Sequence, residues 1–194
     1  MDKELRSKLV ARTGILIALS VMADLFPLPR AFFGMKVDLV GTIWVAAFLL
    51  YGIETATYTS LGTFLLMLAY SPTGFVGATM KLTATAPMFF MPWAVEKISG
   101  GKASSLFGPK LYALGSASGI IVRIFLAFLL NYYWAIPVFL GMPISQVVEK
   151  FFGGSLLALF LYVAALNLVQ GILDATLPWI LVVKFQLKKI SGLI

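Results

Sequence analysis

Three long stretches without a charged residue constrain this chain more than any other feature. No Asp, Glu, Lys or Arg occurs in residues 55–80, 124–148 or 151–173. A run of roughly 18 or more mostly apolar residues is long enough to cross the hydrocarbon of a bilayer as a helix. The chain is 60% hydrophobic and only 12% charged, whereas about 25% of the residues of a soluble domain are charged. The sequence therefore predicts an all-α integral membrane protein.

The apolar runs and the breaks between them predict six transmembrane helices in a single domain, residues 1–194. The two prolines of PLP end the first helix, because proline lacks an amide donor and clashes with the preceding turn. Gly52 separates the second helix from the third, and KISGGKASSLFGPK has the composition of a linker. The expected helices cover residues 9–26, 37–51, 53–70, 75–96, 111–134 and 154–183.

The basic residues predict the orientation of these helices. With six spans, both termini and the loops 2–3 and 4–5 share one side, which carries ten Lys and Arg residues against three on the other. Cytoplasmic segments of membrane proteins are enriched in Lys and Arg. We therefore expect both termini in the cytoplasm and the loops at 27–36, 71–74 and 135–150 outside. The net charge of +7 is then a topology signal and no sign of nucleic-acid binding.

The chain contains no Cys and no His. Their absence excludes disulfides, thiol nucleophiles, imidazole acid–base chemistry and the common zinc and haem sites. No metal-ligand motif, nucleophile motif or paired-carboxylate spacing occurs in the sequence. We expect no catalytic residue, no metal and no resident cofactor.

Polar residues inside the apolar runs mark the candidate binding site. Asn167, Gln170 and Asp174 lie at i, i+3 and i+7, so they share one face of the last helix. Asn131 follows Arg123 by eight residues in the fifth helix, again near one face. The amides either contact a ligand in a common outer cavity or hydrogen-bond between helices. The sequence leaves both possibilities open.

Two charged residues at similar depths predict an ion pair. Arg123 and Asp174 lie roughly 20 Å and 15 Å from the cytoplasmic ends of their helices, at 1.5 Å per residue. A charge inside the bilayer costs at least about 2.5–3.5 kcal/mol, so each needs a partner or a hydrated cavity. We expect Arg123 and Asp174 to join the fifth and sixth helices. The alternative is a direct contact between Asp174 and a ligand.

Further candidates lie near the outer ends of the helices. Lys81, slightly more than one turn into the fourth helix, either extends to the membrane interface or faces the cavity. Asp38 either caps the second helix, with Lys36 or Lys81 as its partner, or contacts a ligand. Thr79 and Tyr132 complete the expected substrate-binding set. The ring of Tyr132 belongs to an aromatic belt or stacks on a planar ligand.

Several segments, in their order and spacing, resemble the substrate-binding S-components of energy-coupling factor (ECF) vitamin transporters, especially the riboflavin type. They are ARTGILIALS, MKVD, TGFVG followed by FFMPWAVEK, LNYYWAIP and NLVQG, and the resemblance covers most of the chain. In the first segment, Gly14 and Ala18 fill a small-xxx-small motif. In that family this motif meets the transmembrane coupling subunit.

The resemblance implies a six-helix protein of the cell membrane with an outer pocket for a vitamin. It implies as partners an ECF transmembrane coupling subunit and two ATP-binding subunits. Asn131 and Asn167 correspond to positions that hold the flavin, and Gln170 replaces a lysine beside them. Lys81 stands where an asparagine is expected, a second departure. Riboflavin is the leading ligand; the alternatives are another water-soluble vitamin or precursor, or a structural membrane protein without a transport role.

Overall fold

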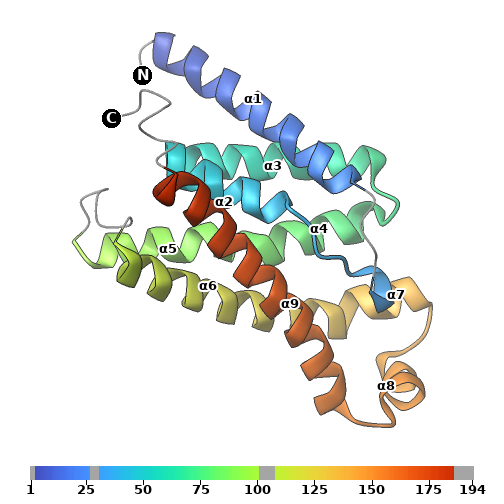
Figure 1. Cartoon of the computed structure of the whole chain (residues 1–194). Helices are drawn as coiled ribbons and strands as arrows, with labels where there is room; N and C mark the ends of the chain where they lie inside the picture. Colours follow the sequence, from blue (N-terminus) through green and yellow to red (C-terminus); the bar gives the residue numbers. More distant parts are fainter. Residues whose placement is uncertain (1–2, 27–30, 101–107, 186–194) are drawn as a thin grey trace.

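The computed structural model describes residues 3–26, 31–100 and 108–185, and every element assigned there is helical (Figure 1). The first half of the chain contains α1 (Lys3–Leu25), η1 (Phe32–Gly34), α2 (Val40–Tyr51), α3 (Ile53–Tyr70), α4 (Gly74–Thr85) and α5 (Pro87–Ile98). The second half contains α6 (Pro109–Leu130), η2 (Asn131–Ala135), α7 (Ile136–Leu140), α8 (Ile144–Phe152), α9 (Leu156–Trp179) and η3 (Ile180–Lys184).

The helix α2 lies at the centre of the bundle, in contact with α1, α3, α5 and α9. Its sequence VGTIWVAAFLLY is apolar on all sides, which is typical of a helix buried by neighbours on every face. Trp44 and Val45 are completely buried there, together with Phe89 of α5. In Figure 1, α9 crosses the bundle, and it packs against α6 and α2. The polar residues of α9 therefore face both of these helices.

The fourth expected helix, 75–96, consists of two helices in the structure. The helices α4 and α5 meet at Ala86, whose own backbone is helical, and Pro87 then lacks the amide hydrogen that would continue the hydrogen bonding of α4. Proline is favoured as the first residue of the next helix, since its amide would have no partner there. The helix α5 lies alongside α6, where a Cβ on Gly115 would lie 2.6 Å from the Cα of Pro92. Glycine therefore permits this close approach.

The fifth helix was expected at residues 111–134, but in the structure the helical stretch is longer and covers Pro109–Leu140. Helical structure continues through the π-helical segment η2 and α7 to Leu140. Residues 144–152, expected in an outer loop, form α8 between two glycines in the left-handed region, Gly141 and Gly153. The prolines at 137 and 143 sit at the first turn or N-cap of these helices, where proline is tolerated. Pro137 therefore lies within continuous helical structure, and Pro143 precedes a new helix.

Two helical stretches of the described part are long and apolar enough to cross a membrane, Pro109–Leu140 and Leu156–Lys184. In the most apolar 18-residue window of each, only 28% of the residues are buried inside the protein. Most residues of these windows are therefore not fully buried by the rest of the protein, and Ile121 and Phe125 of α6 and Leu161 of α9 are exposed.

Candidate binding cavity

A cavity of about 490 Å³ lies between the segment 31–38 and the helices α3, α4, α6 and α9. Ligand pockets in proteins typically measure about 300–1,000 Å³. Much of the wall is apolar, with Met67, Met80 and Leu166 among the lining residues. The polar and charged lining residues are Asp24, Lys36, Asp38, Ser71, Thr73, Lys81, Thr85, Arg123, Asn131, Asn167 and Gln170.

The structure brings together five residues of the expected substrate-binding set: Asp38, Lys81, Asn131, Asn167 and Gln170 all line the cavity.

The two remaining members of the set, Thr79 and Tyr132, are not among the lining residues. The hydroxyl of Thr79 is buried without a hydrogen-bond partner in the described part of the chain. The ring of Tyr132 packs against Phe128 and Tyr133. The ring of Tyr132 is thus in contact with neighbouring aromatic rings and not with the cavity. This position gives no support to a stacking role of Tyr132 in the cavity.

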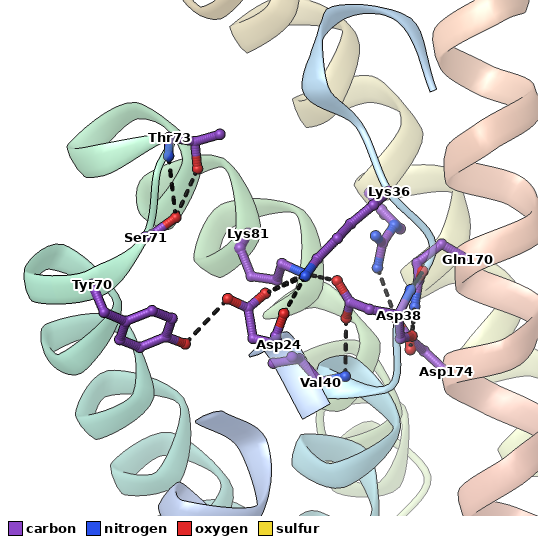
Figure 2. A network of polar contacts seen from close by, with 11 residues as sticks. Asp24, Lys36, Asp38, Val40, Tyr70, Ser71, Thr73, Lys81, Gln170 and Asp174 are labelled. Carbon is purple, nitrogen blue, oxygen red and sulfur yellow. Dashed lines mark hydrogen bonds and ion pairs between the residues drawn. The ribbon is translucent and has the colours of Figure 1, made fainter. Parts of the chain in front are cut away.

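An ion-pair cluster joins α1, the segment before α2, and α4 at one wall of the cavity (Figure 2). Lys81 is paired with Asp38 and lies 3.6 Å from Asp24. Lys36 is 3.1 Å from the same carboxylate of Asp24, which also accepts a hydrogen bond from the hydroxyl of Tyr70 at 3.1 Å. Each carboxylate therefore faces at least one ammonium group.

Asp38 forms the expected ion pair with Lys81, but the N-cap of α2 is Leu39 and not Asp38. Its Oδ1 accepts a hydrogen bond from Val40 N at 3.0 Å, near the start of α2, and Oδ2 pairs with Lys81. Only 2% of Asp38 is exposed. Lys36, its other expected partner, pairs with Asp24 instead.

Gln170 connects this cluster to the polar residues of α9. Its Nε2 donates to Asp38 O and to Asp174 Oδ1, and its Oε1 accepts from Asp38 N, all at 2.8 Å. Figure 2 shows the side chain reaching from α9 to the segment that carries Asp38. Both the oxygen and the nitrogen of the amide are therefore bound within the protein.

Arg123 and Asp174 form the expected link between the fifth and sixth predicted helices, α6 and α9. Arg123 Nη1 lies 2.9 Å from Asp174 Oδ2, and Arg123 Nε donates to Asn167 Oδ1 at 3.1 Å. Asp174 is completely buried and is not a lining residue. Arg123, expected only as a structural residue, does line the cavity. A Cβ on Gly41 would lie 2.2 Å from the Asp174 carboxylate, so α2 packs directly against the pair.

The two asparagines are anchored by their own helices. Asn131 Nδ2 donates to Ala127 O at 2.8 Å, and Asn167 Nδ2 donates to Val163 O at 2.9 Å. Both bonds run four residues back along the helix, which holds each side chain in one orientation. Asn131 lies at the start of η2, and such π-helical interruptions are frequent at functional sites.

The sequence did not identify Asp24 or Tyr70 as residues of this region, and it gave Lys36 the partner Asp38, whereas Lys36 pairs with Asp24. A signal for Asp24 was present, because a carboxylate near the end of an apolar helix needs a partner. Nothing in the sequence identifies that partner, since Tyr70 and Lys81 come from other helices. The contacts depend on how α1, α3 and α4 pack.

The small-xxx-small motif of α1, formed by Gly14 and Ala18, is not part of the cavity lining. Gly14 and Ala18 are both exposed, and a Cβ on Gly14 would meet no atom within 4 Å. This face is therefore free of contacts with the described remainder of the chain, and a contact with a coupling subunit stays a prediction.

Comparison with known proteins finds a similar fold among solved structures. No protein-family model matches the chain, and no curated protein matches it. A solved structure described as "Structure and mechanism of the S component of a bacterial ECF transporter" aligns over 97% of this chain and 98% of its own. The TM-score is 0.67 and the sequence identity is 16%. The chain thus has an all-helical fold similar to that of an ECF transporter S component.

Proposed function

We propose that this chain is the substrate-binding membrane subunit of an ECF-type importer and that its cavity takes a water-soluble vitamin, with riboflavin as the leading ligand. The observation that carries the proposal is the cavity itself, where buried amide and charged side chains from four helices meet an apolar wall. Ligand sites typically combine such an apolar wall with a few placed polar groups.

The exposed apolar surface supports the membrane part of the proposal. In two long helical stretches most residues of the apolar window are not fully buried, and several large apolar side chains are exposed. A soluble monomer rarely exposes large continuous apolar surface, whereas lipid makes such exposure favourable. We place both termini in the cytoplasm, because the charge distribution favours this orientation.

The position of the cavity supports loading from outside. The segment 31–38 and the residues Ser71 and Thr73 line it, and both belong to or border loops assigned to the outer side by the count of basic residues. A ligand would then enter from the outer face. Release inward would require a separate energising module with a transmembrane coupling subunit and two ATP-binding subunits.

The charges around the cavity favour a ligand without net charge. Three cations (Lys36, Lys81 and Arg123) are matched by three carboxylates, which are Asp24, Asp38 and Asp174. A buried charged ligand would therefore lack a free counter-ion, and burial of an unpaired charge is costly. Riboflavin is uncharged at neutral pH and fits this condition.

Ligand binding to the purified chain tests the proposal. Native mass spectrometry would identify a co-purified molecule, and riboflavin would show itself by quenching of its fluorescence on titration. Asn131→Leu keeps the approximate volume of the side chain but removes its carbonyl, so it should weaken binding with an unchanged melting temperature. Tight binding to none of the common water-soluble vitamins would contradict the proposal and favour a structural membrane protein.

A further inference from the structure

The guanidinium of Arg123 has more hydrogen-bond donors than its neighbours use. Nε donates to Asn167 and Nη1 donates to Asp174. A guanidinium carries five N–H groups, and within the described ranges Nη2 has no partner. Nη2 is also not one of the polar atoms that the fold buries without a partner. This nitrogen therefore reaches accessible space.

The accessible space beside Arg123 is the cavity. Arg123 is only 6% exposed and is one of the residues that line the cavity. Since Asn167 and Asp174 hold the other two nitrogens on the side of α9, the remaining nitrogen is the part of the group left to meet a ligand. An unpartnered donor on a buried, fixed guanidinium is thus directed at the cavity.

A second side chain on the same wall, Asn131, has a hydrogen-bond acceptor without a partner in the described part of the chain. Asn131 uses Nδ2 for its bond to Ala127, and its Oδ1 has no partner in the part of the chain that the structure describes. Asn131 and Arg123 are eight residues apart on α6–η2, about 12 Å along the helix axis. By contrast, the amide of Gln170 and the ammonium of Lys81 are bound within the protein.

We propose that Arg123 is a ligand-contacting residue that determines specificity: its Nη2 donates a hydrogen bond to a carbonyl oxygen of an uncharged ligand. Asp174 already neutralises the guanidinium, so a ligand carboxylate would find no unpaired cation there, whereas a carbonyl needs only the free N–H. Asn131 Oδ1 accepts from an N–H or O–H group elsewhere on the same ligand. The inference rests on the proposed function, because it assigns contacts within the same cavity.

A double variant separates this contact from the structural role of the ion pair. Replacing both partners of a buried ion pair by apolar residues is often neutral for stability. Arg123→Met with Asp174→Leu should therefore keep a melting temperature near that of the wild type. Binding of riboflavin should nevertheless weaken about tenfold or more, as expected for loss of a charge-assisted hydrogen bond. Recovery of both stability and affinity in the double variant would show a structural role only and overturn the inference.

Two analogues of the probe test the carbonyl itself. In 2-thioriboflavin and 4-thioriboflavin a ring oxygen is replaced by sulfur, a weaker acceptor. At least one analogue should bind the wild type more weakly than riboflavin does, and this difference should vanish in Arg123→Lys. That variant keeps the charge opposite Asp174 but loses Nη2, and it provides the measurement if the double variant does not fold. Equal discrimination by wild type and Arg123→Lys would overturn the inference.

Failure of the inference and failure of the proposed function are distinguishable. Wild-type protein that binds riboflavin, with variants that bind it equally well, contradicts the role of Arg123 alone. Wild-type protein that binds neither riboflavin nor any other vitamin contradicts the proposed function, and the inference is overturned with it.

Discussion

The side-chain amide of Gln170 is hydrogen-bonded to the main chain of Asp38 in both directions. Asp38 N donates to Oε1 and Nε2 donates to Asp38 O, each at 2.8 Å. The two residues are 132 positions apart. The side-chain amide thus forms the same pair of hydrogen bonds with the main chain of Asp38 that a residue of a neighbouring strand would form. This contact fixes the segment before α2, whose residues 31–38 form one wall of the cavity.

Loss of this amide should loosen the cavity wall. Gln170→Leu leaves Asp38 N and O without their partner, and each buried group left unsatisfied costs about 1–3 kcal/mol. We expect a lower melting temperature in detergent, measured by differential scanning fluorimetry, together with weaker ligand binding. Gln146→Leu is the matched control, since Gln146 is exposed on α8. Equal melting temperatures for the two variants would contradict the role assigned to Gln170.

The ion pair between Arg123 and Asp174 predicts non-additive mutational effects. Removal of one partner of a buried pair costs about 3–5 kcal/mol, because the other charge stays buried and unpaired. Arg123→Ala should therefore destabilise the protein strongly, and addition of Asp174→Asn should restore part of the loss. Denaturant unfolding of the two single variants and the double variant measures the coupling. A double variant as unstable as the sum of the single variants would show that the pair contributes no coupling.

The sequence was sufficient for the features that depend on local pattern. The apolar runs predicted the helices, and α3 covers the same residues, 53–70, as the third expected helix. Five of the seven residues expected to bind the substrate line the cavity. The division into α4 and α5 at Pro87 and the helix α8 were missed, because a proline can end one helix or begin the next. Local sequence does not decide between these two outcomes.

The partners of the polar residues could not be predicted in the same way. The similar depths of Arg123 and Asp174 suggested their contact, but Asp24 contacts Lys36 and Lys81 through the packing of three separate segments. Gln170 was expected as a ligand contact, because a pattern of polar residues does not show which groups satisfy each other. Only the arrangement of α9 against the segment at Asp38 shows that the amide is already bound.

The packing of α2 against the buried pair makes Gly41 sensitive to the smallest substitution. In Gly41→Ala the new Cβ would lie 2.2 Å from Asp174 Oδ2, so the carboxylate or α2 must shift, which disturbs the geometry of the pair with Arg123. Overpacking of this kind typically costs about 1–3 kcal/mol. Gly14→Ala is the control, because nothing lies within 4 Å of its Cβ. Differential scanning fluorimetry should show a lower melting temperature for Gly41→Ala alone; equal values would indicate that α2 adjusts without disturbing the pair.

The exposed small residues of α1 predict a defect in transport that leaves ligand binding intact. Small residues allow a second helix to approach closely, so Ala18→Leu should block the proposed contact with the coupling subunit. Because Ala18 is exposed, stability should change by less than about 0.5 kcal/mol, and the dissociation constant for riboflavin should stay the same. Uptake of riboflavin by an auxotrophic bacterium that expresses the chain with a coupling module measures the defect. Ala165→Leu, at an exposed alanine of α9, is the matched control. Equal uptake by the two variants would show that the α1 face is not the contact surface.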